Sequence, residues 1–94
     1  MEIYELKGRL ADRAESVARM LLPNGKMGSG EWKVGSALGE AGESLSISLR
    51  GTKAGIWSDF ATGDAGDLID LWRTVRGQTL SIALDDVRDY LGIE

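Results

Sequence analysis

The residues whose types and spacing best suggest a chemical role are the aspartates between positions 59 and 70, which could bind a cation or cap a helix. Four of them occur there, at Asp59, Asp64, Asp67 and Asp70. Oxygen ligands suit Mg²⁺ or Ca²⁺, so a cation cluster is one interpretation. The other is turn and cap chemistry, because aspartates near the start of a helix accept hydrogen bonds from its free N–H groups. Neither a calcium-loop spacing nor a Gly-Lys-Ser/Thr phosphate loop is present, which favours the caps.

The residue types that the chain lacks narrow the chemistry further. There is no cysteine and no histidine. Without cysteine, a disulfide, a thiolate nucleophile and a zinc-thiolate site are all excluded. Without histidine, the usual general base and the commonest nitrogen ligand for a transition metal are also missing. An enzyme would therefore have to act through carboxylates alone. Because the acidic residues occur where caps and turns are expected, we expect a non-catalytic protein that holds neither a cofactor nor a metal ion.

Changes in hydrophobic period predict the elements that position these residues. A helical period over residues 6–21, ended by Pro23, predicts an N-terminal helix. Three strand patterns and then two further helical patterns follow, over residues 32–34, 44–49, 56–58, 68–75 and 80–91. This order predicts one α+β domain over residues 1–94, in which a small three-stranded antiparallel meander is flanked by an N-terminal helix and two C-terminal helices.

Short motifs follow one another through most of the chain in a fixed order. They occupy residues 22–26, 35–38, 43–47, 59–62, 63–71 and 80–84. The series resembles the N-terminal zinc-binding domain of DnaG-type and phage or plasmid primases, in which two zinc-binding turns lie between strands and a Gly-Gly-Asp element opens a helix. The resemblance covers about residues 15–93, and it implies a zinc-ribbon-like meander in a domain that precedes a Toprim catalytic core.

At the zinc-ligand positions the chain departs from the family. The resemblance places Gly35, Leu38, Asp59 and Thr62 there, so it implies a degenerate, metal-free form. Structural zinc supplies ~10–16 kcal/mol of apparent folding free energy, and we expect apolar side chains, including a buried Leu38, to replace it. We also expect the Asp59 carboxylate to accept N–H groups two or three residues on, and Phe60 to anchor that turn in the core.

Strand alternation predicts which side chains face the solvent. If Leu45 and Ile47 point to the core, the same parity puts Ile56 and Phe60 inside and Trp57 outside. The exposed face and its loops would then carry one aromatic and four cations, namely Trp57, Lys26, Lys33, Arg50 and Lys53. Such a surface can stack a base of single-stranded nucleic acid while cations neutralise phosphates. The alternative is that Trp57 lies in the core and the charges are merely solvated.

These features lead to two hypotheses about function. The resemblance implies a non-catalytic DNA-replication domain of a phage or mobile element, which binds the single-stranded DNA template weakly and positions it for a Toprim primase core. The net charge of −4, with only four basic against three acidic residues over 23–58, argues against tight binding. The alternative is a protein-interaction module that docks on a primase, a helicase or another protein, and a buried Trp57 favours it.

The chain contains no signal for a membrane. Charges interrupt its first residues where a signal peptide needs an apolar run, and no stretch approaches the ~20 apolar residues that span a bilayer. We expect a cytoplasmic protein with no membrane partner.

Overall fold

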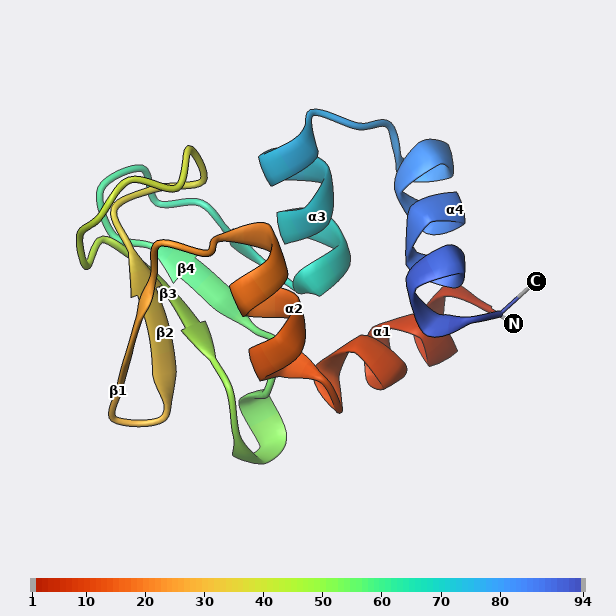
Figure 1. Cartoon of the computed structure of the whole chain (residues 1–94), viewed down its shortest axis with the longest axis horizontal. Coiled ribbons are helices and arrows are strands. Elements are labelled where there is room, and N and C mark those ends of the chain that lie inside the picture. Colours follow the sequence, from red (N-terminus) through yellow and green to blue (C-terminus); the bar gives the residue numbers. More distant parts are fainter. Residues whose placement is uncertain (1, 94) are drawn as a thin grey trace.

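The computed structural model describes residues 2–93, which form helices packed beside an antiparallel sheet (Figure 1). Its first half contains α1 (Ile3–Ala11), α2 (Ala14–Leu21), β1 (Lys26–Gly28), β2 (Glu31–Val34) and β3 (Leu45–Ser48). Its second half contains the 3₁₀ turn η1 (Gly51–Lys53), β4 (Trp57–Asp59), β5 (Ala65–Gly66), α3 (Leu68–Arg76) and α4 (Leu80–Leu91). The strands lie in chain order, each antiparallel to the next. The α+β prediction is confirmed.

Two differences from the predicted elements have local causes. The sheet has five strands in place of three, because β1 and β5 are short and neither contains a buried residue that would reveal a strand pattern. The N-terminal helical pattern forms two helices in place of one. Arg13, with φ −119° and ψ 29°, interrupts the helix, so α1 packs on α3 and α4 while α2 packs on β2 and α3.

The core lies between the helices and one face of the sheet. That face contributes the buried residues Trp32, Val34, Leu45 and Ile47, and the helices contribute buried residues such as Trp72. The alternation predicted for Trp32, Val34, Leu45 and Ile47 is confirmed. The opposite face of the sheet carries polar residues, and the helices lie to one side of the sheet (Figure 1). Among the described residues, no helix is long and apolar enough to cross a membrane.

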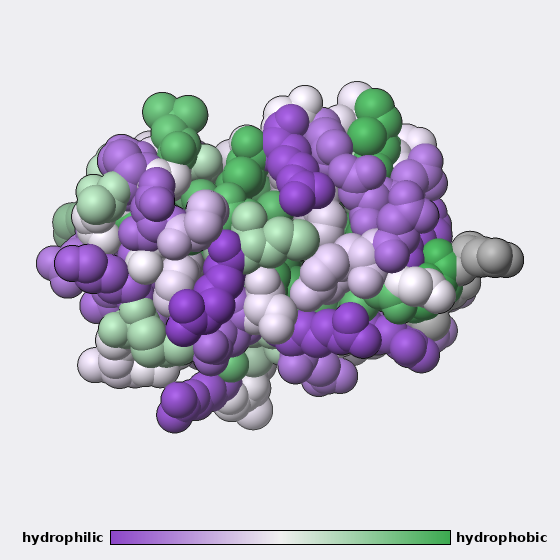
Figure 2. Space-filling model, viewed as in Figure 1, coloured by the Kyte–Doolittle hydropathy of each residue, from purple (hydrophilic) through white to green (hydrophobic). Residues whose placement is uncertain are grey.

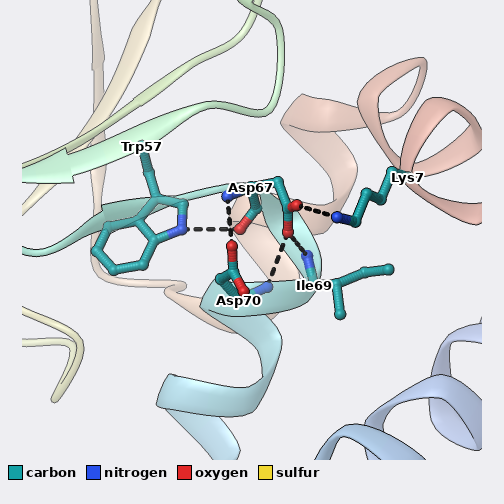
Figure 3. A network of polar contacts seen from close by, with 5 residues as sticks. All are labelled: Lys7, Trp57, Asp67, Ile69 and Asp70. Atoms are coloured by element: carbon teal, nitrogen blue, oxygen red, sulfur yellow. Dashed lines mark hydrogen bonds and ion pairs between the residues drawn. The ribbon is translucent and has the colours of Figure 1, made fainter. Parts of the chain in front are cut away.

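Asp67 and Asp70 form a capping box at the start of α3 (Figure 3). Oδ1 of Asp67 accepts the N–H groups of Ile69 and Asp70, both at 3.0 Å, and Oδ2 of Asp70 accepts the N–H of Asp67 at 3.0 Å. The predicted cap role of these two aspartates is confirmed. Gly77, in the left-handed conformation with φ 62°, ends the helix as the sequence predicts.

Asp67 connects three elements, α1, β4 and α3. Nζ of Lys7 in α1 lies 2.9 Å from Oδ2 of Asp67, and Nε1 of Trp57 in β4 donates to the Asp67 carbonyl at 2.8 Å (Figure 3). Burial opposes ionisation of Asp67, but the N–H of Asp70 and the Lys7 ammonium outweigh it and hold its pKa below the ordinary value. Asp67 therefore sets where α3 begins relative to the sheet and α1.

Candidate functional site

Two loops meet at one end of the sheet. Residues 35–44 join β2 to β3, and residues 60–64 join β4 to β5. Because Val34 pairs with Leu45 and Leu45 pairs with Asp59, both loops leave the sheet at the same end (Figure 1). We call residues 35–44 and 60–64 the loop end.

The first loop is closed by its own hydrogen bonds. Oγ of Ser36 donates to Oε1 of Glu40 at 2.6 Å and accepts the N–H of Leu38 at 3.1 Å. The N–H of Gly39 donates to the Ser36 carbonyl at 3.0 Å, and the N–H of Gly35 donates to the Glu40 carbonyl at 2.7 Å. These bonds leave the Leu38 side chain at the tip, 95% exposed.

The second loop is held in the same way and also presents an apolar side chain. The N–H of Asp59 donates to the Asp64 carbonyl at 2.8 Å, and the N–H of Gly63 donates to the Asp59 carbonyl at 2.8 Å. Gly63 has φ 80°, a conformation that glycine adopts without strain. Phe60 is 95% exposed. In Figure 2, strongly hydrophobic atoms project from the surface on the side of the molecule where the two loops lie.

Hydrogen bonds through Ser44 and Asp59 join the two loops. Oγ of Ser44 donates to Oδ1 of Asp59 at 2.7 Å, and the N–H of Ala61 lies 2.9 Å from both of these oxygens. The N–H of Phe60 donates to the Ser44 carbonyl at 2.7 Å. The Ser44 hydroxyl is the main reason why the pKa of Asp59 lies below its ordinary value; burial opposes this shift, and N–H groups of Ala61 and Thr62 add to it.

The four positions that correspond to zinc ligands in the resemblance all lie in or beside the loop end. Gly35 and Leu38 belong to the first loop, and Asp59 and Thr62 belong to the second turn. Asp59 accepts the N–H two residues on, as predicted. Among residues 2–93, no group of three or more acidic side chains is arranged to hold a metal ion.

Two expectations about this region are wrong. Leu38 and Phe60 were expected in the core, but both are almost fully exposed. The polar Ser44–Asp59 hydrogen bond connects the loops, and neither Leu38 nor Phe60 contributes a buried apolar contact there. Hydrogen bonds through Ser36 close this turn locally, and the Leu38 side chain at its tip is exposed and does not join the core.

The prediction that Trp57 is exposed is also wrong. Trp57 pairs with the buried Ile47 across β3 and β4, and its own side chain is 4% exposed. Ile56, expected inside, is 49% exposed. The inward and outward positions predicted for this strand are therefore displaced by one residue. Such a displacement moves every side chain of a strand to the other face of the sheet. As it lies in this fold, Trp57 cannot stack on a base.

The structure brings together only two of the four predicted cations. Lys26 and Lys33 are cross-strand partners on β1 and β2, on the face that the helices leave uncovered. They line a surface cavity of about 550 Å³ together with Asn24, Ser29 and Glu43, among others. Arg50 and Lys53 follow β3, at the end of the sheet opposite the loop end. Nζ of Lys33 lies 3.8 Å from Glu31, so part of its charge is already paired.

Sequence reasoning missed Leu38 and Phe60 as surface residues. For Phe60 a signal existed, because Trp57, taken as an inward residue, would have placed Ser58 and Phe60 outward. For Leu38 the only signal is its isolation in a segment of small and polar residues, with no strand or helix period around it.

No protein-family model, curated protein or solved structure matches this chain.

The chemical character of the loop end follows from the side chains that it carries. The loop end presents two apolar tips, and the acidic residues within it are Glu40, Glu43 and Asp64. The two loops contain neither lysine nor arginine. Exposed apolar tips beside carboxylates are features of a surface that can contact another macromolecule.

Proposed function

We propose that this chain is a non-catalytic accessory domain that docks on a partner protein through Leu38 and Phe60. The observation that carries the proposal is the 95% exposure of both side chains on loops that hydrogen bonds hold in place. The resemblance to the primase zinc-binding domain indicates which partner to test first, namely a Toprim primase core or a helicase of the same replication system.

Energetics favour contact with a partner at this end of the molecule. Removing a leucine or phenylalanine side chain fully from water contributes ~1.5–3 kcal/mol. Loops that already hold the bound shape lose little conformational freedom on association, so more of that energy appears as affinity. Leu38 and Phe60 lie on two loops that the Ser44–Asp59 hydrogen bond joins, so a partner that covers both would form one apolar contact surface there.

The first prediction tests the two apolar tips. Leu38→Ser and Phe60→Ser, combined, should leave the melting temperature nearly unchanged, because both side chains are already in water in the folded state. The double variant should lose binding to the Toprim core or helicase, measured by isothermal titration calorimetry. Ile82→Ser on α4 is the matched control, since Ile82 is an exposed apolar residue away from the loop end. If the double variant binds as tightly as the control, the proposal fails.

A second candidate, weak binding of single-stranded DNA, is favoured by the lysine pair. Lys26, Lys33, Ser46 and Ser58 are linked by cross-strand pairing on the uncovered face of the sheet. The N–H of Phe60 bonds to Ser44, and β4 alternation carries Phe60 toward that same face. Phe60 could therefore supply the stacking that the buried Trp57 cannot.

The second prediction concerns this face. A short oligothymidine should bind at roughly 10⁻⁴ M, the weak end of non-specific affinities, and more weakly as salt rises. Shifts in an NMR titration should centre on Lys26 and Lys33, and Lys26→Gln with Lys33→Gln should remove them. Leu38→Ser should have no effect on DNA binding, which separates this candidate from docking. Absence of shifts at millimolar DNA and low salt excludes the DNA candidate.

A further inference from the structure

We infer that the partner presents to the loop end an apolar strip bordered by lysine and arginine side chains. This inference rests on the proposed docking function, and it adds the chemistry of the surface that receives Leu38 and Phe60. It follows from the charges around the two apolar tips.

The loop end is acidic and has no cation of its own. The two loops, residues 35–44 and 60–64, include no lysine or arginine, although Lys33 lies in β2 two residues before the first loop begins. The acidic residues Glu40, Glu43 and Asp64 are all exposed. None of the ion pairs formed among residues 2–93 includes any of these three carboxylates. Of the three carboxylates, Glu43 shares a cavity with positive charges, because Lys26 and Lys33 also line that cavity.

One of these carboxylates is held beside an apolar tip. Glu40 accepts the Ser36 hydroxyl, and the same hydroxyl accepts the N–H of Leu38, so Glu40 and Leu38 belong to one hydrogen-bonded turn. Asp64 lies in the turn that presents Phe60, where its N–H donates to Oγ of Thr62 at 3.1 Å. A surface that covers the tips must therefore also approach Glu40 and Asp64.

Burying the tips partly removes water from these carboxylates, which costs free energy unless an opposite charge replaces the water. Cations at the border of the partner surface supply that charge and also speed association. A neutral border on the partner surface would leave the carboxylates unpaired, and an acidic border would repel them. For the same reason nucleic acid and anionic lipid, which both bring negative charge, are poor occupants of a surface that covers Glu40 and Asp64. The DNA candidate rests instead on Lys26 and Lys33 of the uncovered face.

The tips stand on two different loops, which fixes the shape of the partner surface. Leu38 and Phe60 come from the β2–β3 and β4–β5 connections, which are separated at the sheet by β3 and joined through Ser44. Two separate tips require a strip or groove that accepts both, and one deep pocket would accept only one. An amphipathic helix with cationic flanks offers such a strip.

The probe is a helical peptide of about 18 residues with leucines at the i, i+3, i+4 and i+7 positions and lysines elsewhere. Its matched counterpart carries glutamine in place of every lysine. Fluorescence anisotropy gives the affinity for the whole chain, and ¹⁵N shift mapping locates the contact. We expect the lysine peptide to bind about tenfold more tightly at low salt, and most of this advantage to vanish near 1 M salt, where the screening length is about 3 Å.

Charge-removing variants isolate the carboxylates. Glu40→Gln combined with Asp64→Asn should reduce the affinity for the lysine peptide to that for the glutamine peptide, and should leave the glutamine peptide unaffected. Gln retains an acceptor for Ser36, so the turn is preserved. The matched control, Glu5→Gln with Asp89→Asn, removes two exposed charges on α1 and α4 and should change nothing.

The outcomes separate this inference from the docking function itself. If both peptides bind equally and Leu38→Ser with Phe60→Ser abolishes both, the docking function stands and the cationic border is rejected. If binding does not depend on Leu38 and Phe60, or no shifts appear at the loop end, docking through this end fails as well. If phosphatidylcholine vesicles bind through the two tips while the peptides do not, the occupant is a lipid surface and the inference is overturned.

Discussion

At the scale of single residues, Asp59 is the carboxylate that holds the loop end together. It accepts hydrogen bonds from the Ser44 hydroxyl in one loop and the Ala61 N–H in the other, and it is the buried charged residue beside the apolar core. Phe60 is directly attached to this residue, so the position of one apolar tip depends on the Asp59 side chain.

The third prediction is a pH dependence at Asp59. Its pKa in the folded protein lies below the ordinary value of 3.8, so its charge stabilises the fold above that pH and stops doing so as the pH falls through the folded pKa. Asp59→Asn should lower the melting temperature by several degrees at pH 7. The difference from the unsubstituted protein should shrink steadily below about pH 4. A difference that is constant from pH 7 to pH 3 contradicts the account.

At the scale of elements, the start of α3 is a junction with α1 and β4. Asp67 caps the helix, pairs with Lys7 of α1 and accepts the indole N–H of Trp57 at its carbonyl. The cap and the ion pair are separable, because only the cap satisfies the free N–H groups of the helix.

The fourth prediction ranks these two contributions. Asp67→Ala should lower the free energy of unfolding by ~0.5–2 kcal/mol, as expected for a lost cap. Lys7→Gln should cost less, ~0–1 kcal/mol, because the Lys7 side chain is 42% exposed and surface ion pairs contribute little. Urea unfolding at low and high salt measures both. Asp67→Ala removes the cap and the ion pair together, so an effect of Lys7→Gln as large as that of Asp67→Ala would show that the ion pair, and not the cap, holds this junction.

At the scale of the whole molecule, the five-stranded sheet is covered on one face and open on the other. The covered face and the helices share one core, which includes Trp32, Trp57 and Trp72. The loop end and the uncovered face are the two surfaces that we propose for partners. They carry opposite local charge, because Lys26 and Lys33 lie on the uncovered face while Glu40 and Asp64 lie at the loop end.

The fifth prediction concerns the stability of the whole fold. Unfolding should have the same midpoint with and without a strong chelator, because the contact that joins the loops is the Ser44–Asp59 hydrogen bond. Differential scanning calorimetry with added zinc and with chelator makes the comparison. A midpoint that falls by several degrees in chelator, or stoichiometric zinc found by elemental analysis, would refute it.

Local features of the sequence determined much of the fold. The alternation of residues 44–49, the helical periods after Asp67, the cap at Asp67 and the stop at Gly77 each depend on neighbours a few residues away, and each prediction is confirmed. The same holds for the Asp59 turn, since its carboxylate reaches an N–H two residues on.

The candidate site depended on contacts that only the tertiary structure supplies. Whether Trp57 or Phe60 faces outward is set by the pairing of Trp57 with Ile47, ten positions earlier, and a one-residue change of parity exchanges the two faces. Leu38 is exposed because its loop closes on Ser36 and Glu40 and joins its neighbour through Ser44 and Asp59. Hydrophobicity alone favours burial of both residues, and only the paired strands and closed loops place them in solvent.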